Sequence, residues 1–227
     1  MKLSRVLIAS AMLVGSSSTF AADLPWTPDP IMPSWSDAPE AGDTDAATAG
    51  VKWISELPTI MAGKWITFTG ENGAPLKSGK FSIESDGSFK TEQGVALEVH
   101  YYDSDTAEVG ELIKVVGDSS ATVGVSEVQY TIGDVSFESE KGADVSKVKA
   151  IIKQGPNPST AQIVSPNIAN DYSALGLDKE SAGQTFWNIT SGTSDVFTER
   201  VPGDKITASA LVTVDVEFAK GKGKPSR

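Results

Sequence analysis

The chain has 227 residues, of which 39% are hydrophobic and 22% are charged, a composition typical of a folded globular protein that can bury its own core. Acidic residues outnumber basic residues by 30 to 19, which gives a formal net charge of -11; because a phosphate backbone would be repelled over most of such a surface, a nucleic-acid partner is not expected. The sequence contains no cysteine, which excludes disulfides, thiolate metal sites and thiol nucleophiles.

The first residues have the pattern of a secretory signal peptide. Lys2 and Arg5 supply positive charge, residues 6–14 form a short apolar run, and Thr19 and Ala21 place small side chains before a cleavage position. The apolar run is too short to span a bilayer as a helix. We therefore expect residues 1–21 to be removed and the remaining chain to be exported.

Residues 22–50 differ in composition from the rest of the chain. Five prolines precede a segment of small and acidic residues, 40–50. Because proline lacks an N–H donor and small side chains bury little area, this composition predicts an extended arm that forms neither a helix nor a central strand. Trp26 and Trp35 are bulky apolar groups in this arm, which indicates that it docks on another surface.

From residue 51 onward the pattern is that of β-structure. Apolar and polar residues alternate in the segments 65–68, 80–84, 95–101, 121–125, 128–132, 134–138, 184–189 and 206–218. Turn-forming Gly, Asn, Asp and Pro residues separate these segments, which predicts an all-β sandwich or barrel. Two short helices are also predicted, over residues 144–151 with Asp144 as N-cap and over residues 170–175 before Gly176.

The last predicted strand has the longest uninterrupted alternation in the chain. Its apolar positions are Ile206, Ala208, Ala210, Val212, Val214, Val216 and Phe218. Polar residues occupy the intervening positions except at Leu211. One face of this strand should therefore pack in the core while the other contacts water. Alternation alone is equally typical of an ordinary sandwich strand that comes last in the chain.

Gly203, followed by this alternation and the terminal aromatic Phe218, resembles the C-terminal motif of chaperone–usher fimbrial subunits. Residues 51–58, with Trp53, and residues 65–68 resemble the first strand of the same pilins. Among such subunits, the chain resembles the colonisation-factor pilins of the coli surface antigen type. The resemblance covers the two ends of the expected domain, while the middle is similar only in its general β texture.

This resemblance implies an immunoglobulin-like (pilin-type) β-sandwich over residues 51–218 that lacks its last strand. The N-terminal arm, residues 22–50, precedes this domain and a basic tail, residues 219–227, follows it. In such subunits the C-terminal strand, here residues 206–218, borders a hydrophobic groove with a vacant edge. A periplasmic chaperone fills the groove first, and the arm of a neighbouring copy replaces it at an outer-membrane usher.

The function implied by the resemblance is structural. We expect a subunit of a bacterial surface fimbria that assembles by donor-strand exchange and supports adhesion, with a possible host-cell receptor and no enzymatic activity. The expected donor strand lies at the end of the arm and comprises Ala47, Ala49, Val51 and Trp53, of which the first three face the groove. The opposite register, with Ala46, Thr48 and Gly50 facing inward, remains an alternative.

Two features depart from the family pattern. The expected donor strand contains few large apolar side chains, so a shallow groove or additional contacts from the more distal arm would be needed. Nine residues also follow Phe218, whereas chains of this family usually end about one residue after the terminal aromatic residue because the chaperone binds the free carboxylate.

A minor fimbrial adhesin or a carbohydrate-binding module is the alternative function. In this interpretation exposed aromatic side chains stack on sugar rings, and the candidates are Trp65, Tyr101, Tyr102 and Trp187. A hydrolase that uses Glu84 and Asp86 is a third hypothesis, which adjacent carboxylates in a hairpin turn support poorly.

Other chemistry has little support in the sequence. His100 is the only histidine, and we expect it at the surface or in a turn, without the serine elbow that a hydrolase triad requires. Asp103, Asp105 and Glu108 lack the glycine and the distal glutamate of a calcium loop, which predicts a solvated acidic loop. We therefore expect no catalytic residue, no metal and no cofactor.

Overall fold

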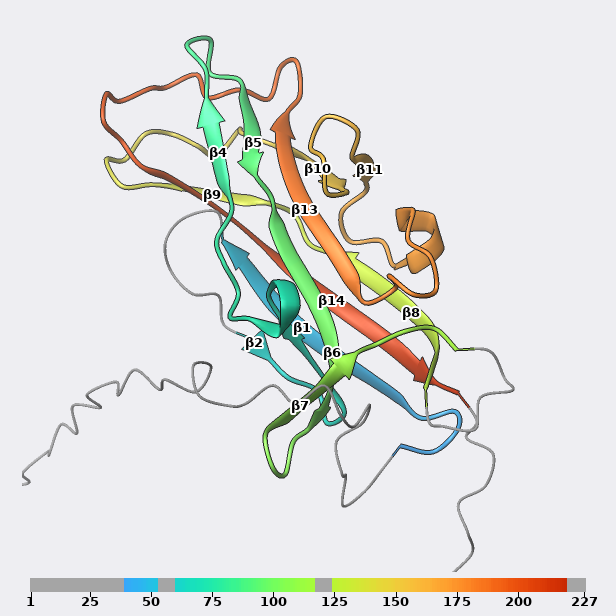
Figure 1. Ribbon diagram of the computed structural model, residues 1–227. Coiled ribbons are helices and arrows are strands. Elements are labelled where there is room, and N and C mark those ends of the chain that lie inside the picture. The colour runs from blue at the N-terminus through green and yellow to red at the C-terminus, as the bar shows by residue number, and fades with distance from the viewer. Residues whose placement is uncertain (1–38, 53–59, 117–123, 220–227) are drawn as a thin grey trace, which may run out of the picture.

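The computed structural model describes residues 39–52, 60–116 and 124–219. The expected signal peptide, most of the arm and nearly all of the tail lie outside these ranges. The described residues form two antiparallel sheets and two short 3-10 helices. Figure 1 shows the layer of β4, β5, β6 and β13 in front of the layer of β1, β8 and β14. Within the described part of the chain, no helix is long and apolar enough to cross a membrane.

The first sheet contains both the first and the last described strands of the chain. Its members are β1 (Thr44–Lys52), β2 (Ile60–Met61), β8 (Val125–Ile132), β9 (Ser136–Ser139), β12 (Asn170–Asp171) and β14 (Ile206–Phe218). The strand order is β12-β8-β14-β1-β2, and β9 also pairs with β14. The thirteen-residue strand β14 is therefore central, with β8 and β9 on one edge and β1 on the other (Figure 1).

The second sheet packs against the first. Its members are β3 (Ile66–Thr69), β4 (Lys80–Ile83), β5 (Phe89–Gln93), β6 (Val95–Asp103), β7 (Glu108–Leu112), β10 (Ala150–Gln154), β11 (Gln162–Val164) and β13 (Gln184–Ser191). One path runs β11-β10-β13-β5-β4, and β6 joins β13, β3 and β7. The 3-10 helices are η1 (Glu71–Gly73) and η2 (Tyr172–Leu175).

A single hydrophobic core lies between the sheets. Val212 and Val214 of β14 and Leu97, Trp187 and Ile189 of the second sheet belong to one buried cluster. At one end of this cluster the aromatic rings of Phe89, Phe137 and Phe197 contact one another with centroids 5.3–5.4 Å apart. The described part of the chain is thus an all-β, sandwich-like protein, as its alternation predicts.

Most of the predicted strands are present, with small shifts of their ends, and several strands are additional. The segment 121–125 is described only from residue 124, and residue 125 opens β8. Strands β5, β7, β10 and β11 were not predicted, because they are short or lack clear alternation. Each of these four has a charged or amide side chain at one end, which shortens the stretch that carries the period-2 signal.

The predicted helix over residues 144–151 is wrong. The Asp144 carboxylate accepts hydrogen bonds from the backbone N–H and the hydroxyl of Ser146, with distances of 2.9 and 2.6 Å, so it stabilises a local turn. Ile151 and Ile152 lie in β10, which pairs with β11 and β13. β-branched residues favour a strand when neighbours are available on both edges.

The helix predicted over residues 170–175 is correct only in part. Asn170 and Asp171 form β12, and a single 3-10 turn follows over Tyr172–Leu175. Gly176 ends this turn with φ 74°, a left-handed conformation that glycine adopts without steric cost.

The prediction that residues 22–50 cannot form a central strand is wrong for the end of that segment. β1 begins at Thr44, crosses the expected domain boundary at residue 50, and lies between β14 and β2. The prolines on which the prediction was based all precede residue 40. The remaining small residues can form a backbone ladder, because pairing requires N–H and C=O groups and not large side chains.

Candidate functional site

The two faces of β14 differ as its sequence predicts. The side chains of Ala208, Ala210, Val212, Val214, Val216 and Phe218 are buried, and Ile206 is half-buried at the start of the strand. On the opposite face Asp215 and Glu217 are exposed, and Leu211 is 51% exposed. The one apolar residue that interrupts the alternation therefore faces solvent.

The expected donor residues lie against this strand within the same chain. β1 pairs with β14 in one antiparallel register, with Ala47 opposite Val214, Ala49 opposite Val212 and Val51 opposite Ala210. Ala47 and Ala49 are 1% and 0% exposed. Trp53 lies outside the described residues. The structure thus places the described part of the expected donor strand against the strand expected to border the groove.

Both edges of β14 are paired, so the expectation of a vacant edge is wrong for the single chain. β1 occupies one edge from Ser209 to Glu217. On the other edge β9 pairs from Ile206 to Ser209, and β8 pairs from Val212 to Phe218. The alternating pattern could not reveal this, because a strand shows the same period whether its edge is free or paired.

Side-chain contacts add to the backbone pairing of β1. The Thr48 and Thr213 hydroxyl oxygens are 3.3 Å apart across the two strands. Asp45 lies on the same face of β1 as Ala47 and Ala49 and reaches the start of β3 in the other sheet. There its Oδ2 accepts hydrogen bonds from the backbone N–H groups of Trp65 and Ile66, at 2.7 and 3.2 Å.

The aromatic candidates for sugar stacking are mostly engaged in packing. Trp187 is fully buried and Tyr101 is 4% exposed, so the expectation that they are exposed is wrong. Trp65 is half-buried and packs edge-to-face against Phe218, with ring centroids 5.7 Å apart, while Lys64 Nζ lies 4.9 Å from the Trp65 ring. Tyr102 is half-buried on β6.

A pocket lies on the outer face of the second sheet, where β5 passes into β6 at Gly94. The Thr91 hydroxyl both accepts from the N–H of Ile189 and donates to its carbonyl, at 2.7 and 2.9 Å. At this point the Thr91 side chain, in place of a backbone ladder, joins β5 to β13. The two strands separate opposite Asn188. The cavity that results has a volume of ≈ 310 Å³.

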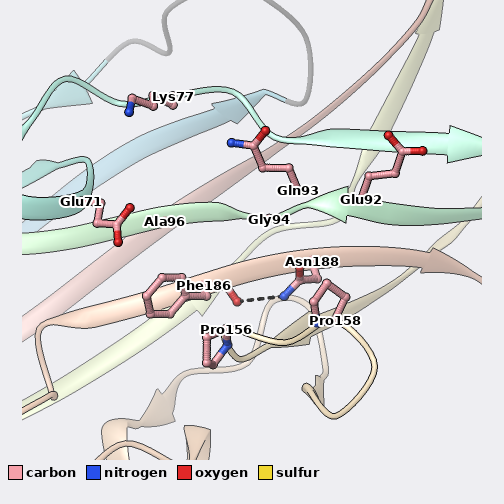
Figure 2. Close-up of a pocket in the computed structure, with 10 residues that line it drawn as sticks. All are labelled: Glu71, Lys77, Glu92, Gln93, Gly94, Ala96, Pro156, Pro158, Phe186 and Asn188. Atoms are coloured by element: carbon pink, nitrogen blue, oxygen red, sulfur yellow. Dashed lines mark hydrogen bonds between the residues drawn. The ribbon is translucent and has the colours of Figure 1, made fainter.

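The pocket combines an apolar wall with polar groups. Figure 2 shows Phe186 and Pro156 on one side and Glu71, Gln93 and Glu92 around the opposite side. Phe186 is half-buried, whereas Glu71, Glu92 and Gln93 are exposed. This mixture of an aromatic ring, proline rings, carboxylates and amides is suited to a polar organic ligand that also has an apolar face.

Asn188 forms part of the pocket wall and is only 2% exposed. Its Nδ2 donates to the carbonyl oxygens of Gly155 and Phe186, at 2.8 and 3.3 Å, and the second of these bonds is drawn in Figure 2. These two acceptors determine the orientation of the amide. Its Oδ1 is buried beside Gly94 and accepts no hydrogen bond from the described residues. This acceptor is enclosed behind the pocket wall.

His100 is buried, 2% exposed, so its expected position at the surface is wrong. Its Nδ1 lies 2.9 Å from the carbonyl oxygen of Gly110, and its Nε2 lies 3.1 Å from Oε2 of Glu98. Glu98 also accepts hydrogen bonds from the backbone N–H of Gly73 and from the Gln184 amide, at 3.0 and 3.1 Å. The η1 turn thus contacts the outer face of β6 at Glu98. No local sequence pattern predicts this contact.

The remaining candidate acids stabilise turns or surface pairs. Glu84 forms an ion pair of 3.0 Å with Lys90, and Asp86 accepts two hydrogen bonds from Ser88. Asp103 is 3% exposed, and its Oδ1 accepts from the backbone N–H groups of Asp105 and Thr106. The expectation of a solvated loop is therefore wrong for Asp103. In the described residues no group of three or more His, Asp or Glu side chains is arranged to hold a metal ion.

Comparisons with known proteins do not assign this chain to a family. No protein-family model matches it, and no match was found among curated proteins or solved structures. The functional argument therefore depends on the residues and contacts described above.

Proposed function

We propose that this protein is a structural subunit of a bacterial surface fimbria, in which β1 of one copy pairs with β14 of the next. The observation that carries the proposal is the nine-residue antiparallel pairing of Thr44–Lys52 with β14, in a position between β14 and β2. The strand that completes this sheet beside β14 comes from the N-terminal side of the domain. In the immunoglobulin-like description, β1 takes the place of the missing last strand.

Exchange of β1 between copies is topologically simple. β1 is the first described strand, and it continues into the rest of the domain only beyond Lys52. An identical strand from a second copy would therefore restore the same contacts with β14. Seven residues separate Lys52 from Ile60. An extended segment of this length spans roughly 23–25 Å, which is the reach available to β1 for pairing with another copy.

Loss of β1 without replacement would be unfavourable. It would unpair one edge of β14 from Ser209 to Glu217 and would uncover the core beneath Ala47 and Ala49. Each lost backbone hydrogen bond costs about 0.5–1.5 kcal/mol net, and an uncovered apolar edge promotes aggregation. The proposal therefore includes a periplasmic chaperone that protects the edge and an outer-membrane usher at which the next copy binds.

The signal-peptide pattern at the N-terminus supports export to the cell surface, where the fibre would act in adhesion. The buried contacts of His100 and the turn contacts of Asp86 support a role without catalysis, since both residues are engaged in structure. The neighbouring copy is thus the main partner in this proposal.

Cysteine cross-linking tests strand exchange directly, because the chain has no cysteine of its own. Ala46 and Asp215 are exposed and directly opposite each other in the β1–β14 ladder. Opposite residues in an antiparallel pair are close enough for a disulfide. We expect co-expression of an Ala46→Cys copy with an Asp215→Cys copy to give a disulfide-linked dimer, detected by non-reducing electrophoresis of material recovered from the cell surface.

The control pairs Ala46→Cys with Glu84→Cys, an exposed position directly after β4 of the other sheet, and should give no such dimer. A chain without residues 22–52 should require the chaperone and should not polymerise. The proposal is contradicted if the Ala46→Cys and Asp215→Cys copies never cross-link, or if the shortened chain is a stable, folded monomer on its own.

Glycan binding is a second candidate function, favoured by the pocket beside Asn188. A pyranose ring would place its C–H face on Phe186 and donate hydroxyl groups to the exposed carboxylates of Glu71 and Glu92. Contacts between two aromatic rings contribute about 0.5–1.5 kcal/mol, and we take this as the scale for a sugar ring on Phe186. This function is compatible with a fimbrial subunit that also contacts a host receptor.

Binding of the assembled fibre to a glycan array tests the second candidate. Phe186→Ala should reduce affinity up to about tenfold, since 1.4 kcal/mol corresponds to a factor of ten. Ile163→Ala is the matched control, because Ile163 is an exposed apolar residue on β11 of the same sheet, outside the pocket. Equal binding by both variants, or no glycan binding by the unmodified fibre, would exclude this pocket as the site.

A further inference from the structure

We propose that Asp45 sets the register of β1 by binding to a backbone socket, formed by Gly63, Trp65 and Ile66, on the copy that supplies β14. This inference rests on the proposed strand exchange, because in a fibre the socket would belong to a second copy of the chain. The interaction surface is thus the start of β3, and its partner is the β1 carboxylate of a neighbouring subunit.

The socket is built for a carboxylate. Two adjacent N–H groups, those of Trp65 and Ile66, converge on Asp45 Oδ2 at 2.7 and 3.2 Å. Hydrogen bonds to an ionised acceptor are stronger than bonds between neutral groups. A hydrogen bond from the N–H of Gly63 to the carbonyl oxygen of Ile66, at 2.9 Å, closes the loop that carries these donors.

Gly63 allows β1 to approach this loop. A Cβ atom at position 63 would lie 2.6 Å from Asp45 Oδ1 and 2.7 Å from the Ala46 carbonyl oxygen. The second of these atoms belongs to the backbone of β1, which cannot move without disturbing the ladder. The loop therefore accepts β1 in this position only with glycine at residue 63.

Other registers lose this contact or bury a charge. A shift of one residue places Thr44 or Ala46 at the socket and turns Ala47 and Ala49 away from the core. A shift of two residues in one direction places Ala47 at the socket. A shift of two in the other direction brings Asp43 to the socket but moves Asp45 into the buried position of Ala47, where an unpaired carboxylate is costly.

The socket also explains how a strand with small side chains can pair in one register. Ala47 and Ala49 differ little from their neighbours in size, so packing alone discriminates weakly among registers. Asp45 is the only charged residue between Thr44 and Val51. The inward set then includes Ala47 and Ala49, and the alternative register with Ala46 and Thr48 facing inward is disfavoured.

Cysteine pairs measure the register in the full-length exported chain. Ala46→Cys with Asp215→Cys reports the observed register. Ala46→Cys with Glu217→Cys reports the shift of two residues that brings Ala47 to the socket, and Ala47→Cys with Asp215→Cys reports a shift of one. With Asp45 present, we expect only the first pair to form a disulfide efficiently.

Replacement of Asp45 by Ala should lower the ratio of in-register to shifted disulfides by about tenfold or more, as expected for loss of hydrogen bonds to a charged group. Gly63→Ala should shift the ratio in the same direction while leaving the carboxylate in place. Asp45→Asn keeps one acceptor oxygen and should give an intermediate ratio. This milder variant also provides the measurement in case Asp45→Ala fails to fold. The matched control is Asp43→Ala, which removes a carboxylate that bonds only to the nearby Glu40 N–H among its described contacts and should leave the ratio unchanged.

The two proposals fail in different ways. The register is scored whether a disulfide joins two copies or two segments of one copy, whereas strand exchange requires a bond between copies. An unchanged ratio in both Asp45→Ala and Gly63→Ala would overturn the role of the socket even if copies cross-link. A changed ratio found only within single chains would retain the socket and overturn the exchange.

Discussion

Glu98 connects several elements through one buried carboxylate. It lies on β6, accepts a hydrogen bond from the η1 turn at Gly73 and another from Gln184 of β13, and contacts His100. Burial opposes ionisation of Glu98, but the hydrogen bonds from His100 and from the backbone of η1 outweigh this effect and hold the pKa of Glu98 below its usual value. The charged form is therefore part of the folded structure.

The lowered pKa of Glu98 predicts how stability depends on pH. A carboxyl group with a lower pKa in the folded state stabilises that state above its unfolded pKa, near 4.3, and this contribution is lost as the pH falls through the folded value. We expect Glu98→Gln to lower the free energy of unfolding by about 1–3 kcal/mol at neutral pH. The decrease of stability in acid should be shallower in this variant, as measured by urea unfolding across the pH range.

Glu84→Gln provides the control for this experiment, because Glu84 is exposed and forms only a surface ion pair with Lys90. Its removal should change stability by no more than about 0.5 kcal/mol. If the free energy of unfolding falls as steeply in acid for Glu98→Gln as for the unmodified protein, the charge of Glu98 does not stabilise the fold.

At the scale of elements, β1 is stabilised mainly by its backbone. Its inward positions Ala47 and Ala49 contribute one methyl group each, whereas the ladder with β14 extends over nine residue pairs. Small side chains allow β1 to fit over the core without displacing the residues of β14. This explains why a segment with so few large apolar residues can complete the sheet.

The close fit of β1 predicts that larger inward side chains are not tolerated. Ala49→Leu should lower the free energy of unfolding by about 1–3 kcal/mol, because Ala49 is fully buried opposite Val212 and the core cannot expand freely. Ala46→Leu is the control on the outer face of the same strand and should have an effect below about 0.5 kcal/mol. Urea unfolding of both variants gives the comparison, and stabilisation by Ala49→Leu would indicate an unfilled groove.

At the scale of the whole molecule, the first and last described strands are neighbours. β1 and β14 come from opposite ends of the described chain, yet their pairing is the longest among the described strands. In the proposed fibre each copy supplies one strand and accepts another, so a single type of junction is repeated along the polymer. Within one chain, the same pairing covers that edge of β14.

The sequence by itself determined the all-β class and the two faces of β14, because both follow from local alternation of side chains along a strand. The small side chains of residues 44–50 also pointed to a segment distinct from the rest of the domain, although their role as a central strand was missed. Local composition describes what a segment can bury, and it does not include the backbone partner that another segment supplies.

Only the tertiary structure decided which edge of β14 is covered, and by which strand. It also buried His100 between Glu98 and the carbonyl oxygen of Gly110, packed Trp187 in the core, and placed Asp45 against the start of β3. Each of these outcomes depends on contacts between residues distant in the chain. Such contacts arise from backbone pairing and sheet packing, which leave no period or spacing in the sequence from which they could have been predicted.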